Sequence, residues 1–179
     1  FLEFGQFAVA AQRSRRDYEE LQDKTNADGI ITGFCSINSA LVGEDDAKAV
    51  AIVYDYSVLA GTQGFFHHAK LDRICEQAKK FYLPVIIFTE GGGGRPGDTD
   101  VLTQIAGLHI PSFSSWAQLT GICLKIAVNN GYCFAGNAVL FGCADFKIAT
   151  KDSWIGMAGP AMIEGGGLGT FKPKEIGPI

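Results

Sequence analysis

Apolar residues along the chain form blocks whose period changes between that of a strand and that of a helix. Residues 49–54 and 85–88 are almost continuously apolar, as in strands that are covered on both faces. Between them, the apolar residues recur at helical spacing, which predicts a helix over 65–82 that ends before Pro84. The same reading predicts helices at 17–24, 112–120 and 134–141, and strands at 29–38, 125–128, 146–149 and 154–156.

This alternation of strands and helices predicts an α/β fold in a single domain over residues 1–179. The chain contains no linker, low-complexity segment or short-period repeat. No apolar run approaches the roughly 18 residues of a membrane-spanning helix, so we expect no membrane association. The chain starts at Phe1 without a basic segment, which gives no sign of a signal peptide, and the missing initial Met suggests a fragment.

The charge and cysteine content narrow the classes of partner. Lys and Arg number 15 against 19 Asp and Glu, a net charge of −4 that argues against a nucleic-acid partner. The five cysteines are dispersed and form no C-x-x-C pair, which indicates reduced thiols in a cytosol-like compartment. No metal-ligand spacing is present, so we expect no metal in this domain.

Glycine is unusually abundant, with 23 residues, and it gathers where predicted strands end. Gly92-x-Gly94-x-x-Gly97 follows the strand at 85–88 and matches a dinucleotide-binding fingerprint. However, the fingerprint also requires an acidic residue about 20 positions later, and no Asp or Glu occurs between Asp100 and Asp145. A phosphate-binding P-loop is excluded because Asp98, and not Lys, follows the last glycine.

The glycine turns at 91–97 and 131–136 indicate a different chemistry. Each one follows a strand and precedes a helix, so its backbone N–H groups lack partners and can face a ligand without a Cβ in the way. Two such turns that meet at one point would form an oxyanion hole. No Gly-x-Ser-x-Gly motif or Cys–His spacing supplies a nucleophile beside it.

Several longer strings carry a family resemblance. They are Leu59-Ala60-Gly61-Thr62-Gln63-Gly64, His68-x-Lys70-x-Asp72-Arg73, the run Glu90 to Asp100, Cys133-Phe134-Ala135-Gly136-Asn137-Ala138, and Gly156 to Gly169. Over essentially its whole length, the chain closely resembles the carboxyltransferase component of biotin-dependent acyl-CoA carboxylases. This resemblance implies the crotonase-like fold, a spiral of β-β-α units, and identifies the chain with the N-terminal, coenzyme A-binding half.

The resemblance also implies the reaction and its participants. A carboxyl group moves from carboxybiotin, held on a separate carrier domain, to the α-carbon of an acyl-CoA through an oxyanion-stabilised enolate. The implied partners are the acyl-CoA, the C-terminal carboxyltransferase half, the biotin carboxyl carrier and the biotin carboxylase, in a homo-oligomer. The implied location is the cytoplasm, or the mitochondrial matrix if the source is eukaryotic.

Site residues follow from the matching positions. The resemblance assigns the oxyanion donors to Gly136 and Asn137, with Gly92, Gly93 and Gly94 lining the other side. Candidates for binding coenzyme A are Arg95, Arg13, Arg15, Arg16, Lys70 and Arg73. Each has a plainer interpretation: Arg95 could pair with Asp98 or Asp100, and the other five could be solvated surface charges.

Relatives of the same fold provide the alternatives. The nucleophilic serine of Clp-type peptidases would fall on Ala135, which cannot attack a carbonyl. Enoyl-CoA hydratases use paired glutamates, for which only Glu90 and Glu164 lie in the glycine loops. A biotin-dependent decarboxylase would run the same half-reaction backwards, and a non-catalytic coenzyme A-binding or oligomer-forming fragment is a further alternative. Because the second half would supply the biotin pocket, we expect the isolated chain to be inactive and to expose apolar surface.

Overall fold

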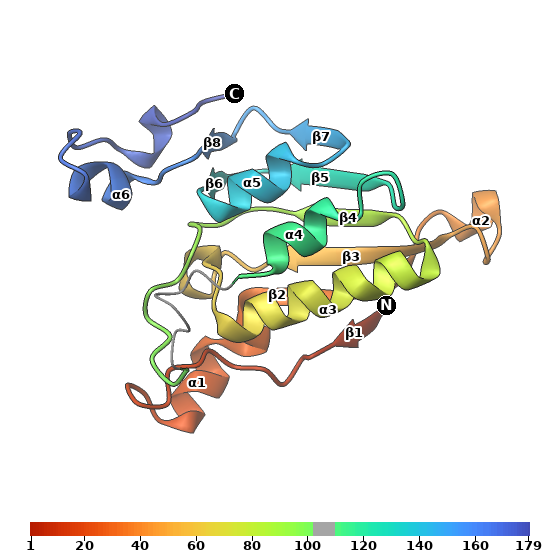
Figure 1. Cartoon of the computed structure of the whole chain (residues 1–179), viewed down its shortest axis with the longest axis horizontal. Helices are drawn as coiled ribbons and strands as arrows, with labels where there is room; N and C mark the ends of the chain where they lie inside the picture. Colours follow the sequence, from red (N-terminus) through yellow and green to blue (C-terminus); the bar gives the residue numbers. More distant parts are fainter. Residues whose placement is uncertain (102–109) are drawn as a thin grey trace.

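A computed structural model describes residues 1–101 and 110–179, and a six-stranded sheet forms its centre (Figure 1). The sheet order is β1-β2-β3-β4-β5-β7. Its strands are β1 (Leu2–Phe4), β2 (Ile30–Ser36), β3 (Lys48–Tyr54), β4 (Val85–Phe88), β5 (Lys125–Asn129) and β7 (Phe146–Ala149). The first three strands pair antiparallel, and β3, β4, β5 and β7 pair parallel.

A second, smaller sheet explains how the chain spirals. β6 (Tyr132–Phe134) and β8 (Trp154–Gly156) pair parallel, and an isolated bridge between Gly91 and Cys133 extends this pairing toward the end of β4. The chain therefore passes repeatedly from a strand of the large sheet to the small sheet and then to a helix. This repeated β-β-α path is the crotonase-like fold that the resemblance implied.

Three helices cover one face of the large sheet (Figure 1). They are α3 (Phe65–Phe81), α4 (Ser112–Ala117) and α5 (Gly136–Gly142). On α3, the residues Leu71, Ile74, Cys75 and Ala78 are buried against the sheet, as their helical spacing predicts. They join Val50, Ile52, Val85, Ile87, Trp116 and Leu140 in one core.

The opposite face of the sheet carries two apolar rows. Sheet register aligns Ala51, Ile86, Ile126 and Phe146 in one row, and Val53, Phe88, Val128 and Ile148 in the other. In the centre of the sheet these side chains are half-buried, apart from Phe88, which is 38% exposed; on the edge strand β7, Phe146 is 62% and Ile148 54% exposed. The expected exposed apolar surface is therefore present on this face.

Shorter elements complete the chain around the sheet. They are α1 (Tyr18–Lys24), α2 (Ser39–Val42), α6 (Pro160–Gly165) and the 3-10 helices η1 (Asn26–Gly29), η2 (Leu59–Gly61) and η3 (Pro173–Glu175). Asp17 caps α1 by accepting a hydrogen bond from the Glu20 amide at 2.7 Å. Within the described ranges, every helix is too short or too polar to traverse a bilayer.

Most expected elements are confirmed within one or two residues, but two regions differ. The helix predicted over 134–141 begins only at Gly136, because Phe134 is the last residue of β6. Its N–H donates to Gly91 O at 2.8 Å, a long-range pairing that local periodicity does not reveal. The helix predicted over 112–120 ends at Ala117, and a series of turns follows it.

Candidate active site

The segment 91–98, here called the glycine loop, follows β4 and lies directly on other backbone. Gly91 N donates to Tyr132 O at 2.7 Å, and Gly92 N donates to Ala60 O at 3.0 Å. A Cβ on Gly91 would lie 2.2 Å from Gly61 O and 2.2 Å from Asn137 Nδ2. This close approach explains why glycine is required at position 91.

Gly93 brings together the two glycine turns that the sequence singled out. Its N–H donates to Asn137 Oδ1 at 3.0 Å, and Asn137 Nδ2 donates to Thr89 O at 3.1 Å. The Asn137 side chain is fully buried, and a Cβ on Gly93 would lie 2.5 Å from the Ala135 Cβ. The Gly93 amide and the Asn137 side chain therefore hold the two loops together, and their hydrogen-bonding groups are already occupied.

The turn from β6 into α5 has an unusual backbone. Ala135 has φ 52° and ψ −120°, a conformation that glycine adopts far more easily than alanine. Val139 N donates to Ala135 O, so the amides of Gly136, Asn137 and Ala138 come before the first i to i−4 bond of the helix. The strained turn thereby presents backbone donors beside the glycine loop.

Gly94 lies at the open side of this arrangement. It is exposed, and a Cβ built on it would meet no described atom within 4 Å. Of the predicted glycines, Gly93 is in close contact with protein, Gly92 is exposed with Thr62 beside it, and Gly94 leaves space for a ligand.

Gln63 is a site residue that the sequence reasoning did not assign. Its N–H donates to Gly93 O at 2.7 Å, and its carbonyl accepts from Arg95 N at 2.9 Å. Its buried side chain donates to the Tyr54 hydroxyl at 2.9 Å, and a Cβ on Gly136 would lie 2.4 Å from Gln63 Oε1. The available signal was its place in the string 59–64, to which we gave no role.

Arg95 lies in a buried ion-pair cluster and not on a surface that could meet coenzyme A. Its side chain is 4% exposed and pairs with Asp28, while Asp98 Oδ1 lies 3.5 Å from Nη1. Its Nη2 also donates to Thr62 O at 2.7 Å. The expected alternative of a structural salt bridge holds for Asp98 but not for Asp100, whose carboxylate accepts from the amides of Arg13 and Ser14.

Burial changes the acid–base behaviour of the groups around this cluster. Burial raises the pKa of Asp28, and the neighbouring Arg95 guanidinium opposes the rise. Burial holds the pKa of His67 well below its usual range and lowers that of His68 to about 4, so both imidazoles are neutral at pH 7. His67 Nδ1 lies 3.2 Å from Asp28 O, and His68 Nδ1 lies 2.9 Å from Ser112 Oγ.

Lys70 is also buried, against the expectation of a phosphate-binding or solvent-facing group. Its Nζ donates to Ala27 O at 2.9 Å and to Ile30 O, and the residue is 8% exposed. Burial lowers its pKa to about 8. Arg73, three residues further along α3, is exposed, so the two side chains do not share a phosphate-binding surface.

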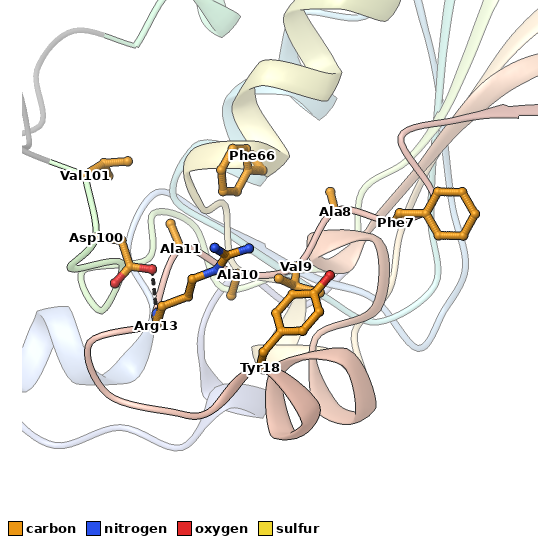
Figure 2. A pocket seen from close by; sticks show the side chains of 10 residues that line it. All are labelled: Phe7, Ala8, Val9, Ala10, Ala11, Arg13, Tyr18, Phe66, Asp100 and Val101. Atoms are coloured by element: carbon orange, nitrogen blue, oxygen red, sulfur yellow. Dashed lines mark hydrogen bonds between the residues drawn. The ribbon is translucent and has the colours of Figure 1, made fainter.

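The N-terminal arginines lie beside the far end of the glycine loop. Arg13 lines a half-open, mainly apolar pocket of about 340 Å³ with Phe66, Asp100 and residues 7–11, and its guanidinium lies 5.1 Å from the Tyr18 ring centre (Figure 2). Arg15 and Arg16 line a second, more polar pocket of about 410 Å³ with Gln12, Glu20 and Leu59. Arg15 and Arg16 therefore share one pocket and Arg13 lines another, whereas the charged ends of Arg95 and Lys70 are buried among protein partners.

The arrangement combines backbone donors, an open glycine and nearby cationic pockets. It can stabilise an oxyanion and bind an anionic ligand, because amide groups and arginines favour negative charge. Ala135 stands at the sharp turn where a serine nucleophile would be needed, and it carries no reactive group. Across residues 1–101 and 110–179, no three His, Cys, Asp or Glu side chains gather closely enough to ligate a metal ion.

Comparisons with known proteins give a family match and several relatives. The family model described as "Carboxyl transferase domain" matches residues 1–171. The acetyl-coenzyme A carboxylase carboxyl transferase subunit beta of Clostridium botulinum is 30% identical over 150 residues, which cover 82% of this chain and 48% of that protein. The methylmalonyl-CoA decarboxylase subunit alpha of Veillonella parvula is 27% identical over 138 residues, covering 76% and 25%.

Among solved structures, a single-chain, multi-domain long-chain acyl-CoA carboxylase superposes with a TM-score of 0.93 and 52% identity. The match covers all of this chain and 18% of that one. The chain thus spans about half the length, or less, of the relatives that it matches.

Proposed function

The chain belongs to the family of carboxyl transferase domains, and from this premise we propose that it is the acyl-CoA-binding half of a biotin-dependent carboxyltransferase. The observation that carries the proposal is the contact between Gly93 N and Asn137 Oδ1, at 3.0 Å. A Cβ on Gly93 would lie 3.4 Å from Gly136 N, so this contact holds the glycine loop against the first amide of α5. The proposed substrate is an acyl-CoA whose thioester oxygen becomes negatively charged when its α-carbon loses a proton.

The amides of Gly136 and Asn137 are the proposed oxyanion donors. As the enolate forms, charge develops on the thioester oxygen, and fixed N–H groups stabilise it without reorganising. One such donor is worth about 3 kcal/mol, or roughly 10²–10³ in rate. Since the enolate is itself the nucleophile, the alanine at position 135 is compatible with the reaction.

Biotin, carried as carboxybiotin on a separate carrier domain, would supply the carboxyl group. The exposed Gly94 leaves open space at the glycine loop for a second reactant to approach the enolate. We assign the biotin pocket to a C-terminal carboxyltransferase half. The isolated chain is therefore expected to be inactive.

Arg13, Arg15 and Arg16 are the proposed ligands of the coenzyme A phosphates. Their two pockets adjoin the N-terminal segment, and Arg15 Nη1 donates to Gly97 O at 3.3 Å at the far end of the glycine loop. Arg95 and Lys70 are given structural roles instead, because buried partners occupy their charged ends. Arg73 is exposed and remains an auxiliary candidate.

The apolar face opposite α3, α4 and α5 supports the proposed assembly. Its two rows end in the exposed Phe146 and Ile148, a surface suited to packing against the C-terminal half or a neighbouring copy in a homo-oligomer. The biotin carboxyl carrier and biotin carboxylase complete the proposed set of partners. All five cysteines are free thiols, which fits the cytoplasm or the mitochondrial matrix.

A decarboxylase is the second candidate, favoured by the similarity to the methylmalonyl-CoA decarboxylase subunit. It would use the same amides, because the enolate is common to both directions of the reaction. The net reaction of the complete enzyme separates the two candidates: a carboxylase forms a carboxylated acyl-CoA, whereas a decarboxylase consumes one and releases CO2. A non-catalytic coenzyme A-binding fragment would bind the thioester and give neither product.

Replacing Gly136 tests the oxyanion assignment in the intact carboxyltransferase that contains this chain. Gly136→Pro removes the N–H at the first position of α5, where proline is tolerated by a helix. Gly136→Ala is the matched control, since it adds a Cβ against Gln63 Oε1 but keeps the N–H. We expect kcat for malonyl-CoA decarboxylation with biotin to be about 10²–10³-fold lower for Pro than for Ala. Equal rates for two folded variants would contradict the assignment.

A further inference from the structure

Gln12, Asp98 and Arg95 form a buried chain of contacts between the N-terminal arginines and the glycine loop. Gln12 Nε2 donates to Asp98 Oδ1 at 3.0 Å, and Arg95 Nη1 lies 3.5 Å from the same oxygen. The second carboxylate oxygen accepts from the N–H of Phe65, the first residue of α3, at 2.8 Å. Gln12 and Asp98 are only 5% and 7% exposed, so little water competes for these contacts.

At one end of this series of contacts, Arg95 holds the part of the glycine loop that contains Gly93 and Gly94. Arg95 N donates to Gln63 O, and Gln63 N donates to Gly93 O at 2.7 Å. Gly93 N in turn donates to Asn137 Oδ1. A Cβ on Gly64 would lie 2.3 Å from Arg95 Nη1 and 2.5 Å from Asp98 Oδ2, so the ion pair rests directly on backbone. A shift of Arg95 would therefore move Gly93 and Gly94.

At the other end of this series of contacts, Gln12 directly precedes the basic segment that contains the N-terminal arginines. Ser14 N donates to the Asp100 carboxylate at 2.8 Å, and Arg15 Nη1 reaches Gly97 O. The basic segment 13–16 is thus attached to the far end of the glycine loop, and Gln12 links it to the ion-pair cluster. An anion that orders this segment would also order Gln12.

We propose that Gln12, Asp98 and Arg95 are positioning residues that couple phosphate binding at residues 13–16 to the placement of Gly93 and Gly94 against α5. The inference rests on the proposed function. Enzymes use the binding energy of remote, unreactive parts of a substrate to orient the reacting centre. A misplacement of about 1 Å can cost about 10²-fold in rate, so a small shift of the loop is sufficient.

Gln12→Met tests the coupling in the intact carboxyltransferase, because it breaks the link to Asp98 with little change in volume. Two thioesters are compared with biotin: malonyl-CoA, and malonyl-N-acetylcysteamine, which lacks the nucleotide and its phosphates. In the wild type, kcat should be about 10²-fold higher for malonyl-CoA. In Gln12→Met, we expect this advantage to fall to about tenfold or less, because kcat for malonyl-CoA falls much more than kcat for the short thioester.

The control is Gln118→Met, an identical change at an exposed glutamine that contacts Lys79 and not the loop. It should leave both rates unchanged. If Gln12→Met lowers both rates equally, or changes neither, the coupling is wrong and a merely structural role remains. A wild type that turns over neither thioester would instead refute the proposed function.

Hydrogen exchange of the Gly93 amide measures the coupling without turnover. Adenosine 3′,5′-bisphosphate, the nucleotide end of coenzyme A, should slow this exchange about tenfold in the wild type. Gln12→Met saturated with the bisphosphate should lose the slowing. Equal slowing in both proteins, or no slowing in a wild type saturated with the bisphosphate, would overturn the proposal.

Discussion

A Cβ on Gly91 would lie 2.2 Å from two neighbouring atoms, whereas at Gly165 and Gly167 it would meet no described atom within 4 Å. The glycine loop at 91–98 and the cluster at 165–169 look alike in sequence. In the first, glycine permits backbone to lie on backbone. In the second, Gly167 has φ 71°, and glycine is favoured there because it adopts that backbone angle easily. Glycine content alone therefore does not locate the site.

The surroundings of the two segments differ in the same way. The glycine loop is bonded on both sides by Ala60, Gln63 and Tyr132. The C-terminal arm, residues 157–175, is largely exposed, and its apolar side chains Met157, Met162 and Leu168 are at least 69% exposed. Rigid placement of catalytic amides requires the first environment, whereas the second suits a surface that another chain covers.

Gly91→Ala should produce the largest effect. The added methyl group must displace backbone at Gly61 or the buried Asn137 side chain, so we expect a loss of about 3 kcal/mol or more in the free energy of unfolding. Urea denaturation followed by circular dichroism measures the change.

Gly165→Ala is the matched control for this substitution. It adds the same methyl group to open space at the end of α6, and we expect the free energy of unfolding to change by less than about 0.5 kcal/mol. Similar losses for the two variants would show that the contrast between the segments is wrong.

The pH dependence of stability between pH 4 and 6.5 should also arise from the packed part of the molecule around the glycine loop. His67 and His68 lie there, on α3, whereas the C-terminal arm has no histidine. Both pKa values are lower in the folded state than in the unfolded one. The unfolded chain therefore binds more protons in this range, and stability falls as the pH falls. From pH 7.5 to 5.5, we expect a loss of about 1 kcal/mol for each imidazole.

His68→Gln isolates one of these contributions. Its stability should fall by about 1 kcal/mol less than that of the wild type over the same pH interval, measured by urea denaturation at both pH values. An unchanged pH dependence would assign the effect to other groups.

Replacing alanine by glycine should change the free energy of unfolding in opposite directions beside the glycine loop and in the C-terminal arm. These are the smallest changes that we expect. Ala135→Gly relieves an unfavourable backbone conformation, and we expect a gain of about 0.5–1 kcal/mol. Ala161→Gly, in the exposed helix α6, should lose up to about 1 kcal/mol through lower helix propensity. Thermal unfolding distinguishes the two signs, and a loss at both positions would remove the argument for strain at Ala135.

Local periodicity was sufficient for elements with a strong apolar pattern. The helix at 65–82 and the strand at 85–88 match α3 and β4 closely, because α3 buries an apolar face against the large sheet and β4 lies in the centre of that sheet. The pattern missed β1 and β6, each three residues long. Their existence depends on pairing with β2 and β8, which are distant in the sequence.

For the candidate site, the sequence predicted which backbone turns come together, but it did not predict which charged side chains are buried. The turns at 91–97 and 131–136 were identified from glycines that follow strands, and they do meet in the structure. Arg95 and Lys70 were candidates for binding coenzyme A, because cationic side chains pair with phosphates. Their burial depends on partners such as Asp28 and the carbonyl of Ile30, which no local spacing connects to them.

The backbone at Ala135 has a consequence for the selectivity of the reaction. A hydroxyl at this strained turn would point a nucleophile toward a thioester carbonyl that is already polarised by the α5 amides. Acyl transfer to the protein would then compete with carbon–carbon bond formation, and each acylation would release free coenzyme A. Under the proposed function, the methyl group of alanine removes that competing pathway, so the same turn would activate a thioester without consuming it.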